Sequence, residues 1–287
     1  MGELMRLFTA SIVLALTVAA TPASAQTTSA PATPPGSQAQ ASGDAINPDR
    51  PGIADGSAVI GRGWFQLEAG VQQERRSDAG IKERATTIPS LFRIGVTNRF
   101  ELRVESNTFT HVTVTGPGSL SASSSDFAPI SIGAKLQFQE SDGPAQPSLG
   151  VIGRVFPASG TSGVKTTKTT GDVRFAADWD VTPMLSINPN VGIGRYEGDN
   201  GETFTTALFA LTLSTFNAAK TLNPFVDISI QAAEGPGAGS AIIVDGGLAY
   251  VPAPNVQLDL SGGKGVRGDS PAQWFVAVGL SIRVRER

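Results

Sequence analysis

Apolar and polar residues alternate with a period of two in many segments from residue 63 onward, and Gly, Pro, Asn or Asp bounds most of them. In 127–139, for example, Ile132 and Leu136 share one face, while Lys135 and Gln137 share the other. A period of two is typical of a β-strand, whose successive side chains point to opposite faces. The pattern therefore predicts an all-β protein with about twelve strands: 63–74, 87–97, 99–113, 127–139, 148–156, 171–181, 184–196, 203–216, 223–232, 241–251, 255–262 and 274–284.

The connections between these segments alternate between long and short. Those after the odd-numbered segments have 12, 13, 14, 6, 8 and 11 residues, whereas those after the even-numbered ones are 98, 140–147, 182–183, 217–222 and 252–254. An up-and-down antiparallel barrel has this rhythm when one rim carries loops and the other carries turns. An even number of strands also places both ends of the barrel on the short-turn rim.

The predicted strands favour a transmembrane barrel over a soluble one. They have about 8–15 residues, and about 9–11 tilted residues cross a bilayer. Charges of both signs lie on their polar face, which suits a hydrated lumen better than a closed core. Aromatic residues gather near strand ends, as in the girdles of outer-membrane barrels. At the short-turn rim these are Phe65, Phe100, Phe138, Trp179 and Tyr250, and Trp274 lies at the other rim.

The amino-terminal residues have the features of an export signal. Arg6 precedes 14 uncharged residues, 7–20, and Ala23-Ser24-Ala25 follows as a signal-peptidase site. We expect residues 1–25 to be a cleaved signal peptide and 26–46 to be a flexible periplasmic linker, because 26–46 has too few apolar residues to fold. The barrel domain then comprises residues 47–287.

The composition excludes several kinds of chemistry. The chain has no Cys and one His, so it has neither disulfides nor Cys-ligated metals, and no site built from two imidazoles. Its 22 Lys and Arg residues nearly balance 25 Asp and Glu residues, which argues against nucleic-acid binding. We expect no cofactor and no metal.

Two motifs resemble a known bacterial family. The first contains Asp49-Arg50-Pro51-Gly52, Asp55-Gly56-Ser57 and Gln66-Leu67-Glu68-Ala69-Gly70. The second is 89–95, PSLFRIG, which leads into Glu101-Leu102-Arg103. Together they resemble the start of the barrel in the MetA-pathway of phenol degradation family of outer-membrane proteins. The resemblance implies an outer-membrane barrel that transports small, often aromatic, solutes. One departure is the non-aromatic carboxyl terminus, where Val284 precedes three charged residues.

Ten charged residues on the polar face are candidates for the pore lining. Opposed charges in a pore order water and select solutes by charge and size. Alternatively, they pair across strands and fill a barrel too narrow to conduct, since twelve strands fall between filled eight-stranded barrels and open porins. The candidates are Glu68, Arg93, Glu101, Arg103, Glu105, Lys135, Arg154, Asp172, Arg174 and Asp178.

The Asp49-Arg50-Pro51-Gly52 motif has two interpretations. It docks back into the periplasmic mouth of the barrel, or it is only a turn, because Pro fixes φ and Gly permits positive φ.

An enzymatic alternative rests on His111 and Thr113, which share one face of the 99–113 strand. A His-x-Ser/Thr pair is similar to that of the outer-membrane phospholipase. Counting along the strand turns His111 toward the lumen, however, whereas a phospholipid hydrolase must face lipid. We therefore expect no enzymatic activity.

The sequence predicts a passive outer-membrane channel for small solutes, with a non-conducting structural or interaction barrel as the alternative. Its expected partners are the bilayer, the solute and the barrel-assembly machinery.

Overall fold

The computed structural model describes residues 45–285 except 199, 218 and 269–271. Within them lie one short 3₁₀ helix, η1 (Ser162–Val164), and fifteen strands. None of the helical structure in this part of the chain is long and apolar enough to cross a membrane. The strands are β1 (Trp64–Asp78), β2 (Ile81–Thr87), β3 (Ser90–Gly95), β4 (Phe100–Ser106), β5 (Phe109–Thr115), β6 (Ser121–Phe127), β7 (Ile130–Gln139), β8 (Ser148–Phe156), β9 (Thr170–Thr182), β10 (Leu185–Glu197), β11 (Thr203–Thr215), β12 (Leu222–Gln231), β13 (Ala241–Ala253), β14 (Val256–Arg267) and β15 (Trp274–Arg285).

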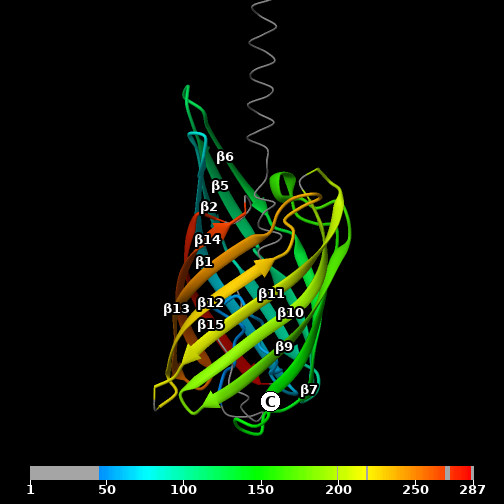
Figure 1. Ribbon diagram of the computed structural model, residues 1–287, viewed down its shortest axis with the longest axis vertical. Coiled ribbons are helices and arrows are strands. Elements are labelled where there is room, and N and C mark those ends of the chain that lie inside the picture. Colours follow the sequence, from blue (N-terminus) through cyan, green and yellow to red (C-terminus); the bar gives the residue numbers. More distant parts are fainter. Residues whose placement is uncertain (1–44, 199, 218, 269–271, 286–287) are drawn as a thin grey trace, which may run out of the picture.

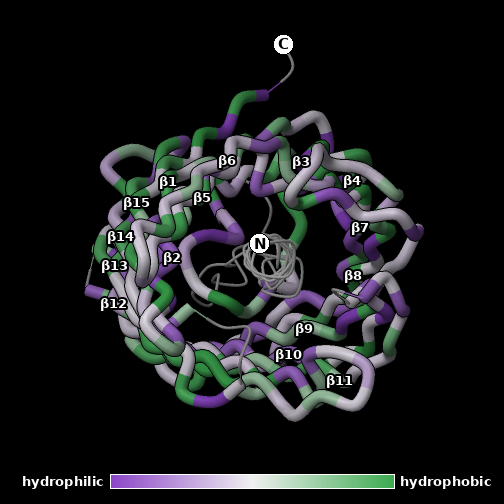
Figure 2. The backbone as a smooth tube through the Cα atoms, turned by 90° about the horizontal axis from the view of Figure 1, so that it is seen from above, coloured by the Kyte–Doolittle hydropathy of each residue, from purple (hydrophilic) through white to green (hydrophobic). Residues whose placement is uncertain are grey.

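The strands form one closed antiparallel barrel (Figures 1 and 2). The barrel closes where β1 pairs with β15 over 12 residue pairs, from Trp64↔Arg285 to Arg75↔Trp274. β2 and β3, β4 and β5, and β6 and β7 each continue one another, so the barrel has twelve strands. The predicted fold class, an up-and-down barrel of about twelve strands, is confirmed. Both ends of the barrel domain lie at the short-turn rim.

Each of the three interrupted strands breaks at a specific local feature. Ile88-Pro89 separates β2 from β3, and Ala128-Pro129 separates β6 from β7. Proline has no N–H to donate to a ladder, so it is confined to edges and bulges. At the third break, Thr108 has a positive φ of 33°. The breaks after β4 and β6 change which residues face inward. Odd-numbered residues such as Glu105 on β4 and Ser131 on β7 are buried, whereas on β5 and β6 the even-numbered residues Thr110 and Asp126 are buried.

Two of the predicted long loops are wrong, because strands occupy most of their residues. The connection 75–86 is largely strand, because β1 continues to Asp78 and β2 begins at Ile81. In 114–126, β5 extends to Thr115 and β6 occupies Ser121–Phe127. The sequence of β6, SASSSDF, does not alternate in hydropathy because five of its seven residues are small polar or acidic. β2, β5 and β6 extend beyond the other strands at the top of Figure 1.

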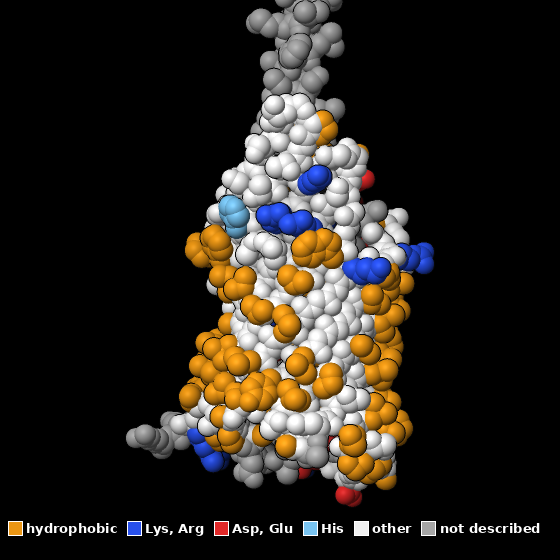
Figure 3. All heavy atoms as spheres, turned by 90° about the vertical axis from the view of Figure 1, so that its left-hand side faces the viewer, with side chains coloured by type: hydrophobic (Ala, Val, Ile, Leu, Met, Phe, Trp, Pro, Cys, Tyr) orange, Lys and Arg blue, Asp and Glu red, His pale blue; other side chains and the backbone are white. Residues whose placement is uncertain are grey.

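The outward face of the barrel is apolar. Val71, Phe175, Ile193 and Val278 are between 47% and 58% exposed, although all four lie in the middle of strands. Figure 3 shows such side chains spread over the lower part of one face, below a surface with few apolar groups. An outward apolar band is how a barrel meets the hydrocarbon core of a bilayer. We call this surface the lipid belt.

The lumen is occupied by the chain that precedes β1. All residues from 48 to 61 are buried. The segment begins at the short-turn rim, where the Ile46 N–H donates to the carbonyl of Pro254 at 2.6 Å, and returns there, where the Gly63 N–H donates to Gly95 at 2.9 Å. We call residues 45–62 the inserted segment. The expected signal peptide, 1–25, lies outside the described residues, as does the expected linker, 26–46, except for its last two residues.

Candidate functional site

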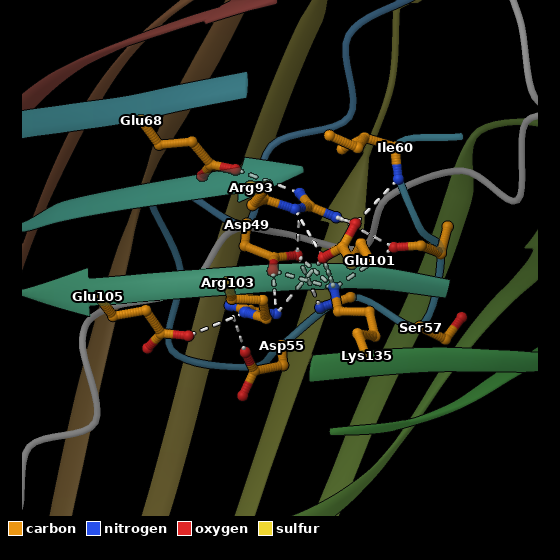
Figure 4. Close-up of polar contacts among 12 residues, drawn as sticks. Asp49, Asp55, Ser57, Ile60, Glu68, Arg93, Glu101, Arg103, Glu105 and Lys135 are labelled. Atoms are coloured by element: carbon orange, nitrogen blue, oxygen red, sulfur yellow. Dashed lines mark hydrogen bonds and ion pairs between the residues drawn. The ribbon is translucent and has the colours of Figure 1, made fainter. Parts of the chain in front are cut away.

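The ten charged residues proposed as pore lining all project inward and are at most 5% exposed. They come from six strands, β1, β3, β4, β7, β8 and β9, and therefore occupy one continuous part of the wall. Five of them carry positive charge and five carry negative charge. This charged half of the wall faces the inserted segment (Figure 4).

Asp49 of the inserted segment is the centre of the first group of contacts. Its carboxylate accepts hydrogen bonds from Lys135 Nζ at 2.9 and 3.0 Å and forms an ion pair with Arg103 Nη1 at 2.7 Å. Arg93 Nη1 lies 3.7 Å away. Burial alone would raise the pKa of Asp49, but the charges of Arg93, Lys135 and Arg103 outweigh it and hold this pKa below its usual range. Asp49 is therefore a buried anion held by three cations.

Asp55 is the centre of the second group. Its carboxylate accepts from Arg154 Nη2 at 2.9 Å, Arg103 Nη2 at 3.3 Å and Arg174 Nη1 at 3.4 Å. Burial raises the pKa of Asp55, but the charges of Arg154, Arg103 and Arg174 lower it further than burial raises it. Arg103 bridges the two groups, so Asp49 and Asp55 share one continuous ion-pair network.

Wall side chains also bind the backbone of the inserted segment. The N–H groups of Arg50, Ile53, Asp55, Ser57 and Ile60 donate to side-chain oxygens at 2.7–2.9 Å. A buried backbone group without a partner is costly, so these contacts replace the water that the segment leaves behind. Five different strands provide the acceptors, which are Glu68, Asp227, Asn190, Asp178 and Glu101.

The four-residue motif at 49–52 lies within the lumen. Arg50 Nη2 pairs with Asp259 Oδ1 of β14 at 3.0 Å, on the opposite side of the barrel from the partners of Asp49. Pro51 and Gly52 are buried beside it. The motif therefore connects the charged half of the wall to β14.

Sequence reasoning missed several residues of this site. Asp55 and Ser57 belong to a family motif, but the sequence does not predict their contacts. Asp55 accepts a hydrogen bond from Arg154, and the Ser57 N–H donates to Asp178. Asn188 and Tyr196 project from β10, where the Tyr196 hydroxyl donates to Asp172 at 2.9 Å. The alternation of 184–196 places both residues on the inward face, so the same signal that predicted the charged residues also indicates these two uncharged ones.

Inward-facing glycines give the segment room. A Cβ atom on Gly95 would overlap the carbonyl oxygen of Gly61, and one on Gly150 would lie 2.6 Å from the carbonyl oxygen of Ser57. One on Gly70 would lie 2.5 Å from Arg50 Nη2. The wall is thus shaped to the inserted segment as well as charged to bind it.

We expect Gly150→Ala to lower the free energy of unfolding by about 1–3 kcal/mol, the usual cost of overpacking. The matched control is Gly153→Ala on the same strand, because nothing lies within 4 Å of a Cβ at that position. The control should change stability by less than about 0.5 kcal/mol. Denaturant unfolding of the two variants in lipid measures the difference, and equal shifts would contradict the close fit.

The half of the wall formed by β11–β15 carries fewer charges, since Asp227, Asp245, Asp259 and Arg283 project inward there among small hydroxyl residues. The side-chain hydroxyls of Ser214, Ser261 and Ser281 are buried without a hydrogen-bond partner among the described residues. Buried polar atoms are nearly always hydrogen-bonded, to protein or to water. This small-residue half is therefore where water is expected beside the inserted segment.

The predicted orientation of His111 is wrong. The break at Asn107-Thr108 inverts the alternation, so Thr110 is buried and His111 faces outward. His111 Nδ1 shares a hydrogen bond with Ser125 Oγ at 2.8 Å, and Nε2 lies 3.4 Å from Thr113 Oγ1. These contacts include no carboxylate or amide that would orient the ring for catalysis. No group of three or more potential ligands within the described residues could hold a metal ion.

The model of the family "Putative MetA-pathway of phenol degradation" matches residues 48–284. The chain belongs to this family. The match begins at the inserted segment and ends in β15, so it covers the whole barrel. No curated protein matches the sequence.

The chain is similar to several solved structures. The COG4313 outer membrane channel from Pseudomonas putida F1 has a TM-score of 0.60 and 10% identity, with 79% of this chain and 98% of that chain covered. The KdgM porin has a TM-score of 0.47 and 12% identity, with coverages of 76% and 98%. The CymD monoaromatic hydrocarbon channel has a TM-score of 0.42 and 8% identity, with coverages of 79% and 89%. A closed barrel with an apolar outer belt places this family member in the outer membrane.

Proposed function

We propose that the protein is a passive channel for small solutes, including aromatic ones. The observation that carries the proposal is the asymmetry of the lumen. The ion pairs of Asp49 and Asp55 are all with the charged half of the wall, whereas the small-residue half opposite contacts the segment through Asp227 and Asp259 and has buried serine hydroxyls with no protein partner within the described residues. This arrangement supports a narrow hydrated path along β11–β15. The description of the family, phenol degradation, supports aromatic solutes.

The charges of the wall indicate how the channel selects. The ten residues of the charged half are balanced in sign, and Asp49 and Asp55 of the inserted segment pair with all five of its cations. Selection by size should therefore dominate, with little preference between cations and anions.

A non-conducting barrel is the second candidate. The observation that favours it is the inserted segment itself, which crosses the lumen between Asp259 on one side and Lys135 on the other.

Flux measurements distinguish the two functions. The refolded protein in liposomes should admit arabinose and phenylalanine but exclude the trisaccharide raffinose, and planar bilayers should show a small conductance. Ser261→Trp should lower both signals severalfold because Ser261 is 4% exposed and projects into the small-residue half. Leu260→Trp is the matched control. Leu260 precedes Ser261 on β14, but its side chain points outward and is 56% exposed on the lipid belt. A folded native protein without flux would favour the non-conducting barrel, and equal effects of the two tryptophans would exclude the path along β14.

The proposal includes export and assembly. Residues 1–25 would direct export as a cleaved signal peptide, and the barrel-assembly machinery would recognise β15. Val284, which is 59% exposed and pairs with Phe65, is the apolar residue of that strand nearest the carboxyl terminus.

A further inference from the structure

Three basic residues lie on the outward face of the barrel, close to the long-loop rim. Arg75 belongs to β1, and Lys82 and Arg84 belong to β2; all three are exposed. Arg75 pairs directly with Arg84, and Lys82 pairs with Ser77 one row further out. We call these three residues the outer basic patch. Figure 3 shows Lys and Arg side chains above the lipid belt on this face of the barrel.

The pairing within this patch is unfavourable in isolation. Like charges directly opposite each other on neighbouring strands repel. Neither Arg75, Lys82 nor Arg84 forms an ion pair with a carboxylate among the described residues. The arrangement thus concentrates positive charge with no compensating anion in this part of the protein.

The nearby carboxylates point the other way. Glu74 and Glu83 alternate with the basic residues and project inward, where Arg76 lies 3.7 and 3.5 Å from them. The strand alternation therefore places three cations outside, and two carboxylates that share one arginine inside.

The surface just below the patch is apolar and aromatic. Val71, Val276 and Phe127 are 47%, 48% and 60% exposed. Trp274 lies beside the patch, and the Arg75 guanidinium lies 4.9 Å from the centre of its ring. A cation over an aromatic ring at the edge of an apolar belt is typical of a membrane interface.

Hydroxyl groups complete the surface. On β5, Thr113 is the cross-strand neighbour of Arg84, and Thr115 is the cross-strand neighbour of Lys82. On β6, Ser123 is in turn the cross-strand neighbour of Thr113. Guanidinium, ammonium and hydroxyl groups together are suitable donors to phosphate oxygens.

We propose that the outer basic patch binds the phosphate-bearing headgroup of a lipid in the outer leaflet, of the lipid A kind, whose acyl chains lie on the belt below. The long-loop rim is the outer side of such a barrel, so the patch meets the outer leaflet. A soluble anion would use the charges but not the apolar surface beside them. An uncharged lipid would use the belt but leave the repulsion between Arg75 and Arg84 unrelieved.

Binding of purified lipid A to the full-length protein in detergent tests this proposal. We expect the triple variant Arg75→Gln, Lys82→Gln, Arg84→Gln to bind about tenfold more weakly or worse. Lipid A stripped of its phosphates should bind the native protein as weakly as intact lipid A binds the variant. Inorganic pyrophosphate should compete poorly, because it lacks acyl chains.

The matched control removes the same charge from exposed residues outside the patch: Arg62→Gln, Arg99→Gln, Lys220→Gln. It should bind lipid A like the native protein. Equal losses in the two triple variants would overturn the proposal, as would undiminished binding by the patch variant or by dephosphorylated lipid. The heat-dependent mobility of each variant on a gel shows that the barrel is folded, and Arg84→Glu alone gives a second measurement if the triple variant does not fold.

Discussion

Deleting residues 45–60 should raise the single-channel conductance of the refolded protein severalfold. All residues from 48 to 60 are buried in the lumen, where they take the place of water along the charged half of the wall. A twelve-stranded barrel without such a segment has a lumen wider than that of a side-chain-filled eight-stranded barrel. The barrel should still fold, because the five cations and five anions of that wall remain balanced. Water would then hydrate the side chains that the inserted segment contacts in the native protein. Planar-bilayer recordings measure the change.

The matched control for this deletion removes residues 28–43, which shortens the chain by the same number of residues and leaves the inserted segment whole. Its conductance should equal that of the native protein. If the two deletions behaved alike, the inserted segment would not limit the current. Raffinose influx gives a second measurement, and it should appear only when residues 45–60 are removed.

Asp55→Asn should lower the free energy of unfolding by about 3–5 kcal/mol, the usual cost of removing one partner from a buried ion pair. Asp55 is 0% exposed and has three guanidinium partners, Arg103, Arg154 and Arg174. The asparagine amide would place a donor where these groups need an acceptor. The remaining repulsion among the guanidinium groups would then be only partly offset by Asp172 and Glu105.

Denaturant unfolding in lipid measures the effect of Asp55→Asn. Asp142→Asn is the control, since Asp142 is exposed in the 140–147 turn and should change stability by less than about 0.5 kcal/mol. A loss no larger than that of the control would mean that the wall arginines do not depend on Asp55. Increased conductance in Asp55→Asn would show in addition that the ion pairs hold the inserted segment in place.

The sequence predicted the barrel well because alternation is a local property. Each strand must present Leu, Val or Ile to lipid on one face and polar residues to the lumen on the other, so a period of two is visible without knowing the neighbours. The same property placed Glu101, Arg103 and Lys135 on the inner face.

Prediction failed where the strands leave the bilayer. The outward face of β6 meets water, so SASSSDF carries no alternation. The break at Asn107-Thr108 also inverted the face of His111, because one added residue exchanges the two sides of a strand.

The sequence by itself determined the fold class, the strand order and the inward position of the ten charged residues, since all three depend on short-range periodicity and chain connectivity. Only the tertiary structure decided what those residues bind. Asp55 and Arg174 are 119 residues apart, and Arg50 and Asp259 are 209 apart. They meet because barrel closure brings every strand within reach of the inserted segment, and no local pattern records such a contact.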